Sequence, residues 1–297
     1  MKRLLIYLFG VFLGVVILDV ACRLIVTPLF DNPPANTKAS ATYKFVSCKE
    51  PANVIILGAS RANHHYISQL MEDSLGVPVY NYGWDGRCTL YQYLCLLRGI
   101  ENGSLNTVIL DISEAQFSKE WVDDRISDLY PYYWKNDTVK MMVNEVEKKN
   151  MSVLMLSSLI QYNSQYLNMV APMANFKGYT PLPYTGKPLD ISGRQIGNRN
   201  GHTSNFFSDI AIKYFVRMAD ICRKNSIQFY VCLSPSLSIT KDDENYIERL
   251  CLKNEIECWN LTNYLVDPIL FSDATHLNDE GAKLFTQEII KRLILKR

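Results

Sequence analysis

A serine at the end of an apolar run is the first residue that could do chemistry. Val54–Leu57 is an unbroken row of Val, Ile and Leu, followed by Gly58, Ala59 and Ser60. Such a row is typical of a strand covered on both faces, and Gly58 allows a sharp turn after it. A helical pattern begins at Ala62, so we expect Ser60 just before a helix, where free amides stabilise negative charge. This placement suits a nucleophile, although a serine that only caps the helix would have the same pattern.

A nucleophilic serine needs a base, and the base needs a group that fixes its orientation. His276 lies in a loop before the last predicted helix, with Asp273 three residues ahead of it. This spacing allows one turn to hold the carboxylate beside the imidazole, at the sheet edge where we expect Ser60. A helix-capping Asp273 and a surface His276 would have the same spacing, so the pair is a hypothesis.

Other residues are candidates for lining the same site. Asn81 and Gly83 end the second predicted strand, where the Gly83 amide could approach an oxyanion next to the amide of Ser60. Arg61 follows the nucleophile directly, and His64 has helical spacing toward the site. His202 stands in a Gly-His-Thr segment and is a candidate for substrate contact.

Three of these segments together resemble blocks of the SGNH (GDSL-like) serine hydrolase family. Gly58–Arg61 is similar to the first block, 81–83 to the second and 273–278, an Asp-x-x-His segment, to the last. The resemblance implies a three-layer α/β/α sandwich of flavodoxin-like topology. It also implies a Ser60–His276–Asp273 triad that acts without a cofactor.

One family feature is missing after the third predicted strand. The family has an oxyanion-binding Asn there, whereas this chain continues from 108–112 into Ser113 and Glu114. In this respect the chain looks more like a membrane-anchored branch that includes the teichoic acid D-alanine transfer protein and the alginate acetylation proteins. That resemblance implies action on envelope glycans.

The order of predicted elements supports the same fold class. Strands alternate with helices in a pattern that predicts a five-stranded parallel sheet inside an α/β/α sandwich. The predicted strands are 53–58, 77–82, 107–112, 227–233 and 256–261, and the predicted helices are 62–75, 89–100, 206–224, 242–254 and 279–295. Residues 113–205 interrupt this alternation as an insertion or cap, with helical stretches near 138–149 and 151–170. We expect this whole insertion, 113–205, to form the acceptor side of the pocket.

The N-terminus predicts a membrane segment. Residues 1–26 carry Lys2 and Arg3 before an apolar run that is about long enough to cross a bilayer needing ~20 residues. Asp19 and Arg23 are spaced to pair near its far end. We therefore expect an uncleaved anchor with the rest of the chain outside the cytoplasm. A signal peptide whose apolar core ends at Leu18, or a lipoprotein box before Cys22, is an alternative.

After the anchor, the polar and proline-rich residues 27–51 predict a short spacer, and 52–297 form the hydrolase-like domain. The formal charge of +1, with both signs interspersed, argues against a nucleic-acid partner. Neither the eight cysteines nor the four histidines show the spacing of a metal site, and no disulfide pairing can be deduced.

Two functions from different classes fit these observations. The first is a membrane-anchored, extracytoplasmic serine esterase or acyltransferase that acts on acyl groups, in the first place O-acetyl groups, of cell-envelope carbohydrate or on a small acyl ester. A transferase would also need a membrane protein as acyl donor. The second is a glycan-binding or assembly factor that keeps the fold without efficient catalysis. Its sugar-stacking candidates in the insertion are Trp121, Tyr130, Tyr132, Tyr133, Trp134, Tyr179 and Tyr184.

Overall fold

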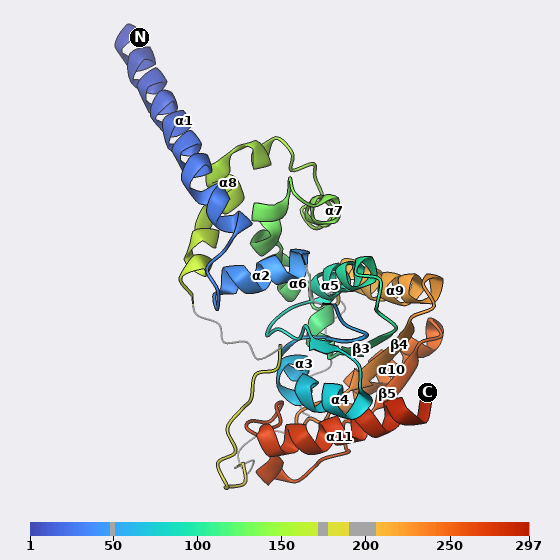
Figure 1. Ribbon diagram of the computed structural model, residues 1–297. Helices are drawn as coiled ribbons and strands as arrows, with labels where there is room; N and C mark the ends of the chain where they lie inside the picture. The colour runs from blue at the N-terminus through green and yellow to red at the C-terminus, as the bar shows by residue number, and fades with distance from the viewer. Residues whose placement is uncertain (48–50, 172–177, 190–205, 297) are drawn as a thin grey trace. The chain divides into compact units, whose positions relative to one another are not determined.

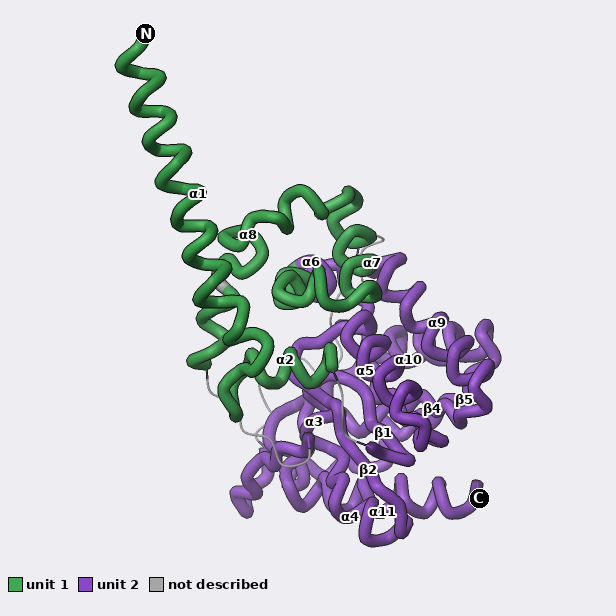
Figure 2. The backbone as a smooth tube through the Cα atoms, turned by 45° about the horizontal axis from the view of Figure 1, so that its top comes forward, with its two compact units in different colours: residues 1–47, 124–174 green, residues 48–123, 175–297 purple. Residues whose placement is uncertain are grey.

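The computed structural model describes residues 1–47, 51–171, 178–189 and 206–296 (Figure 1). The chain forms two compact units, each made of segments that are distant in sequence. One unit combines residues 1–47 with 124–174, and the other combines 48–123 with 175–297 (Figure 2). We call them the N-terminal unit and the sheet unit.

The sheet unit is built on five parallel strands in the order β2-β1-β3-β4-β5. This confirms the predicted α/β class, and the order is that of flavodoxin-like folds. Nearly every residue of β1, β2 and β3 is buried, as the unbroken apolar run at β1 indicates. The strands are β1 (Val54–Leu57), β2 (Val79–Asn81), β3 (Thr107–Asp111), β4 (Gln228–Leu233) and β5 (Glu257–Asn260).

Helices cover both faces of this sheet. Helices α5 and α9 pack together on one face, whereas α3 and α4 pack against α11 on the other (Figure 1). Helix α10 connects β4 to β5, and Thr240 caps its first turn by accepting a hydrogen bond from the amide of Asp243 at 3.1 Å. The bounds are α3 (Ser60–His65), α4 (Ser68–Leu75), α5 (Thr89–Glu101), α9 (Asp209–Lys224), α10 (Lys241–Lys253) and α11 (Asp279–Lys296).

The sequence predicts one helix over 62–75, but the structure has two. The backbone of Tyr66 is extended between α3 and α4. The side-chain amide of Asn81 donates to the carbonyls of Ala62 and Tyr66, at 2.6 and 3.0 Å. A residue from the neighbouring strand therefore satisfies the end of α3, so the break depends on a contact that helical periodicity does not record.

The predicted insertion 113–205 is divided between the two units. Its first residues, including the 3₁₀ helix η1 (Glu114–Phe117), stay with the sheet unit, where Ser118 bridges to Phe207. Helix α6 (Lys119–Arg125) then leads into the N-terminal unit. The predicted helix over 151–170 is instead a series of short turns, η3 (Leu154–Leu156), α8 (Ser158–Tyr162) and η4 (Asn163–Met169).

The N-terminal unit begins with α1 (Lys2–Asp31) and α2 (Lys38–Ser47), and it also contains η2 (Ile126–Tyr132) and α7 (Asp137–Val146). Helix α2 lies within the predicted spacer. It buries Ala39, Phe45 and Val46 and contacts η2 and η4. The structure differs from the spacer prediction because the apolar side of α2 finds a partner only when residues 124–174 fold against it.

Helix α1 is long and apolar enough, with a mean hydropathy of 2.6, to be a membrane span or a signal sequence. Asp19 and Arg23 were predicted to pair with each other, but their hydrogen bonds go to residues at the start of α8. Asp19 Oδ1 accepts from the Ser157 hydroxyl and the Leu159 amide at the start of α8, and Arg23 donates to the Ser158 hydroxyl at 3.0 Å. The far end of α1 is thus held by α8 of its own unit.

Candidate active site

The turn after β1 places Ser60 at the first residue of α3. Gly58 has a φ of +149°, and a Cβ atom there would lie 2.5 Å from the carbonyl oxygen of Asp111. Only glycine fits this close approach between neighbouring strand ends without a shift of the backbone. This close approach explains why glycine stands at position 58. The turn that it allows brings Ser60 to the carboxyl edge of the sheet.

Ser60, His276 and Asp273 form a continuous chain of hydrogen bonds. The Ser60 Oγ lies 2.7 Å from the Nε2 of His276, and the His276 Nδ1 lies 2.8 Å from the Oδ2 of Asp273. With Nδ1–H donating to the carboxylate, Nε2 carries the lone pair that faces the serine hydroxyl. This is the arrangement in which a serine can lose its proton to a neutral imidazole.

The loop that carries Asp273 and His276 is closed by its own backbone. Phe271 and Leu277 form an antiparallel bridge across it, and the Ser272 amide donates to the His276 carbonyl at 2.9 Å. The Asp273 Oδ1 accepts from the amides of Thr275 and His276, at 2.7 and 3.0 Å. Burial alone would raise the pKa of Asp273, but the hydrogen bonds from His276 and Thr275 outweigh burial and hold it well below its usual range.

This lowered pKa leads to a prediction about stability and pH. A carboxylate with a depressed folded-state pKa stabilises the fold above its unfolded value of about 3.9, and that contribution is lost as pH falls through the lower folded value. We expect the parent protein to have a higher melting temperature than Asp273→Asn between about pH 8 and pH 5, and this difference to shrink in stronger acid. Thermal melts of both proteins across this range would measure it. A margin that already vanishes near neutral pH would contradict the assigned carboxylate.

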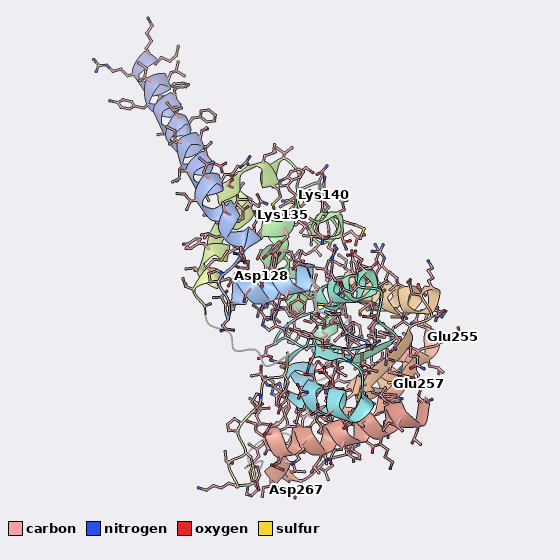
Figure 3. All side chains as sticks on the ribbon, in the orientation of Figure 1. Asp128, Lys135, Lys140, Glu255, Glu257 and Asp267 are labelled. Carbon is pink, nitrogen blue, oxygen red and sulfur yellow. The ribbon has the colours of Figure 1, made fainter. Side chains whose placement is uncertain are left out.

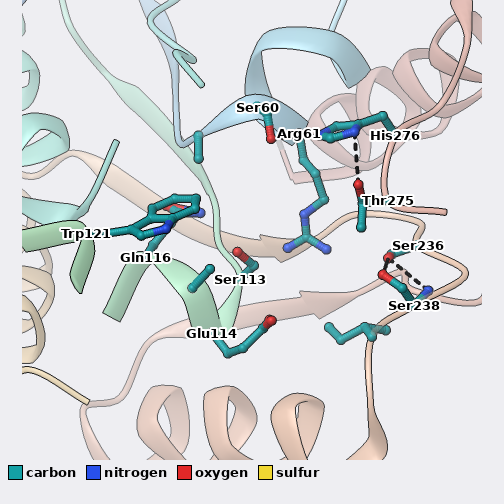
Figure 4. Close-up of a pocket in the computed structure, with 13 residues that line it drawn as sticks. Ser60, Arg61, Ser113, Glu114, Gln116, Trp121, Ser236, Ser238, Thr275 and His276 are labelled. Atoms are coloured by element: carbon teal, nitrogen blue, oxygen red, sulfur yellow. Dashed lines mark hydrogen bonds between the residues drawn. The ribbon is translucent and has the colours of Figure 1, made fainter. Parts of the chain in front are cut away.

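A pocket of about 230 Å³ opens beside Ser60 and His276 (Figure 4). Figure 4 shows Trp121 and Gln116 on one side of it, and Ser236 and Ser238 on the other. The sequence did not single out most of these residues, because they lie in the segments after β3 and β4, which carry no periodic signal. The lining residues are Ala59, Ser60, Arg61, Ser113, Glu114, Ala115, Gln116, Trp121, Ser236, Ser238, Ile239, Thr275 and His276.

Arg61 lines this pocket, but other groups of the protein already hold its guanidinium. Its Nε lies 3.3 Å from the Oδ1 of Asp111, and both side chains are almost fully buried. It also donates to the carbonyls of Ile112 and Ser234 beyond β3 and β4. Arg61 thus ties the start of α3 to the ends of β3 and β4.

His65 is a buried positioning residue that the sequence gave no reason to select. Its Nε2 accepts a hydrogen bond from the Leu277 amide at 3.0 Å, so Nδ1 carries the hydrogen that faces the Ser234 hydroxyl at 2.9 Å. Burial and the nearby Arg61 charge hold the pKa of His65 well below its usual value. The neutral ring therefore links α3, which begins at Ser60, to the loop that carries His276.

Gly83 and Asn81 have structural roles in this arrangement. The Gly83 amide donates to the Oδ1 of Asn81 at 2.7 Å, so it is not directed at an oxyanion. A Cβ atom on Gly83 would lie 2.2 Å from the Asn63 nitrogen, which shows that this turn packs tightly against α3. Asn81 is buried, with its amide bonded to the end of α3 as described above. Neither residue lines the pocket, contrary to the roles predicted for them.

His64 lies next to the imidazole of His276 without lining the pocket. Its ring meets the His276 ring edge-on, with centroids 5.5 Å apart, and its Nδ1 lies 2.7 Å from the Thr180 carbonyl. Burial disfavours the charged ring, but the hydrogen bonds to Asp85 and Thr180 outweigh it and raise the pKa of His64. His202 lies outside the described residues, as do 172–177 and 190–205 of the predicted acceptor side.

Metal binding has no visible support among the residues that the structure describes. They contain no group of three or more His, Cys, Asp or Glu side chains that could hold an ion. Seven of the eight cysteines are described, and these seven are free thiols, mostly buried.

Comparisons with known proteins add a likeness of structure. No protein-family model and no curated protein matches the chain. Among solved structures, it is similar to a protein described as lipolytic and of the G-D-S-L family from Desulfitobacterium hafniense, at 9% identity and a TM-score of 0.40, covering 80% of this chain and 97% of that one. A GDSL-like lipase from Bacteroides thetaiotaomicron aligns at 11% identity and a TM-score of 0.37, covering 82% and 87%. Similarity at this level does not decide the activity, which has to be argued from the geometry of the site.

Proposed function

We propose that this chain is a membrane-anchored serine esterase or acyltransferase that acts outside the cytoplasm on acyl groups of cell-envelope carbohydrate. The observation that carries the proposal is the Ser60–His276–Asp273 chain, with distances of 2.7 and 2.8 Å between its successive members. A capping serine needs no such partners, whereas a nucleophilic serine needs both of them.

The reaction proceeds through an acyl-enzyme. Ser60 Oγ attacks the ester carbonyl while His276 Nε2 takes its proton, and His276 then returns that proton to the departing alcohol. Asp273 stays ionised and stabilises the imidazolium through Nδ1–H. Water or a sugar hydroxyl next attacks the acyl-enzyme, with His276 again as the base, and this second acceptor distinguishes hydrolase from transferase.

The pocket supports a polar substrate with a planar apolar face. Hydroxyls of Ser113, Ser236 and Ser238 surround it, and Trp121 offers an aromatic ring at one side (Figure 4). Sugars combine hydroxyls with apolar C–H faces that stack on aromatic rings, which is why we favour a carbohydrate ester. The Ser60 amide, at the first position of α3, is the oxyanion donor that remains in the proposal, because Gly83 is occupied.

A fluorophosphonate probe tests whether the site is catalytic. We expect the full-length protein to be labelled at Ser60 and to release acetate from acetylated glycans. Adding an acceptor sugar separates the two activities, since a transferase moves the acyl group to it. Glycan binding without probe labelling would favour the assembly factor and would contradict the proposed chemistry.

The proposed anchor leads to a separate prediction. Lys2 and Arg3 precede the apolar helix, so the helix should stay in the membrane with the remaining chain outside the cytoplasm. We expect carbonate washing of membranes to leave the full-length chain in the pellet. Protease added to intact spheroplasts should digest the sheet unit. A full-length chain in the wash would contradict the anchor, and a shortened chain there would show cleavage of a signal sequence.

A further inference from the structure

A group of exposed apolar side chains lies next to the far end of α1 in the N-terminal unit. Val153 and Leu156 are 77% and 59% exposed, and Leu154 and Ile160 are 39% and 40% exposed. Four such residues within eight positions exceed the isolated apolar residues that are normal on protein surfaces. We call Val153, Leu154, Leu156 and Ile160 the apolar ledge.

The length of α1 places this ledge at the level of the bilayer surface. Residues 1–18 are exposed throughout, and contact with the rest of the unit begins at Asp19. Lys2 to Leu18 rises roughly 25 Å at 1.5 Å per residue, less than the ~30 Å hydrocarbon core. A spanning α1 must therefore keep several residues beyond Leu18 in the membrane, and these are the residues that touch α8.

The hydrogen bonds of Asp19 and Arg23 fix the ledge at that depth. Asp19 accepts from the Leu159 amide, and Arg23 donates to the Ser158 hydroxyl. Both charged groups are therefore satisfied by the ledge segment, as a membrane boundary requires. On α1 itself, Leu24 and Ile25, next to Arg23 in sequence, remain 71% and 67% exposed.

Aromatic and basic side chains border the ledge as they border membrane-embedded surfaces. Trp134 is half exposed, and its indole donates to the Met155 carbonyl at 2.9 Å. The Lys140 ammonium lies 4.9 Å from the Trp134 ring centre, on α7, where Figure 3 labels it. Lys148 and Lys149 are exposed shortly before the ledge. Amphipathic rings and lysines are favoured where hydrocarbon gives way to headgroups.

We propose that the apolar ledge is inserted into the same bilayer that α1 spans, so that the N-terminal unit rests in the membrane surface. The occupant is lipid, because hydrogen bonds join the ledge segment directly to the apolar helix α1, and tryptophan and lysine lie at the border of the ledge. This inference rests on the proposed anchoring of α1 and is independent of the catalytic proposal. It gives the N-terminal unit a role as a platform at the membrane surface.

Tryptophan quenching by brominated lipid tests the depth of the ledge. The full-length chain would be reconstituted in phosphatidylcholine vesicles with and without bromine on the acyl chains, as Val153→Trp and as Leu252→Trp. Leu252 is a matched control, since it is 80% exposed on α10 in the sheet unit. We expect the added emission of Val153→Trp to be blue-shifted and to lose a large part of its intensity on brominated lipid. The added emission of Leu252→Trp should lose none.

Further variants test the ledge through Trp134, the tryptophan already present at its border. Trp134→Phe should remove a quenched component from the parent spectrum, and Val153→Asp with Leu156→Asp should lower the quenching of Trp134 while α1 keeps the chain on the vesicles. If the added tryptophans of Val153→Trp and Leu252→Trp were quenched equally, or not at all, in protein that floats with the vesicles, the proposed membrane insertion of the ledge would be wrong. A blue shift that depends on protein concentration instead of lipid would overturn it in favour of self-association. Fluorophosphonate labelling of the same samples reports separately whether the catalytic proposal holds.

Discussion

Ser60→Ala and His276→Ala should each lower the turnover of an acyl ester by about 10⁴- to 10⁶-fold. The reason is geometric, because the Ser60 Oγ and the His276 Nε2 are 2.7 Å apart and neither group can act without the other. Asp273→Asn should be milder, at about 10²- to 10⁴-fold, since it disturbs the tautomer of His276 but leaves nucleophile and base in place. The measurement is steady-state hydrolysis of an aryl acetate by the full-length proteins.

Two neighbours of the triad serve as controls for this prediction. His64→Gln changes an imidazole whose ring centre is only 5.5 Å from that of His276, and Ser238→Ala removes another hydroxyl of the pocket. Each of these substitutions should lower turnover by much less than the ~10²- to 10⁴-fold that a general base contributes. A folded Ser60→Ala protein with near-parental turnover would refute the nucleophile, and a greater loss in His64→Gln than in His276→Ala would reassign the base.

Breaking the Arg61–Asp111 pair should have the largest effect on stability. Removing one partner of a buried ion pair leaves an uncompensated charge, which costs about 3–5 kcal/mol. Asp111→Ala leaves Arg61 in this state and also removes the acceptor of the Tyr66 hydroxyl, 2.8 Å away. We expect the free energy of unfolding to fall by that amount in chemical denaturation of the detergent-solubilised chain.

The matched control is an exposed ion pair in the same unit. Asp220 lies 3.0 Å from Arg223, and both side chains are more than half exposed. Asp220→Ala should therefore cost only about 0–1 kcal/mol. Combining Asp111→Ala with Arg61→Met should recover part of the loss, because the orphaned charge is gone. Equal effects of Asp111→Ala and Asp220→Ala would show that the buried pair does not hold the strand ends together.

Arg61 illustrates how position in sequence and role in structure can differ. Its place beside Ser60 suggests substrate contact, and its side chain does line the pocket. Its donors, however, are directed at Asp111 and at two strand-end carbonyls. Asp111→Ala should thus also slow catalysis, since it loosens the helix that begins with the nucleophile.

The sequence by itself determined the features that depend on local physics. The apolar run at Val54–Leu57 specifies a buried strand. The small residues Gly58 and Ala59 specify the sharp turn after it, because larger side chains do not fit there. Asp273 and His276 are three residues apart, so one short loop is enough to bring them into contact. The alternation of strand and helix patterns likewise predicted the parallel sheet, since each pattern reflects which faces of its own element are buried.

Only the tertiary structure decided what depends on segments that are distant in sequence. Ser60 and His276 are 216 positions apart, and their meeting follows from the order in which the strands assemble. The Gly83 amide is taken by Asn81, and α2 joins residues 124–174 in a separate unit. Each outcome reflects competition among partners for a hydrogen bond or an apolar face. Periodicity reports that a face is to be buried, whereas the folded chain decides which partner covers it.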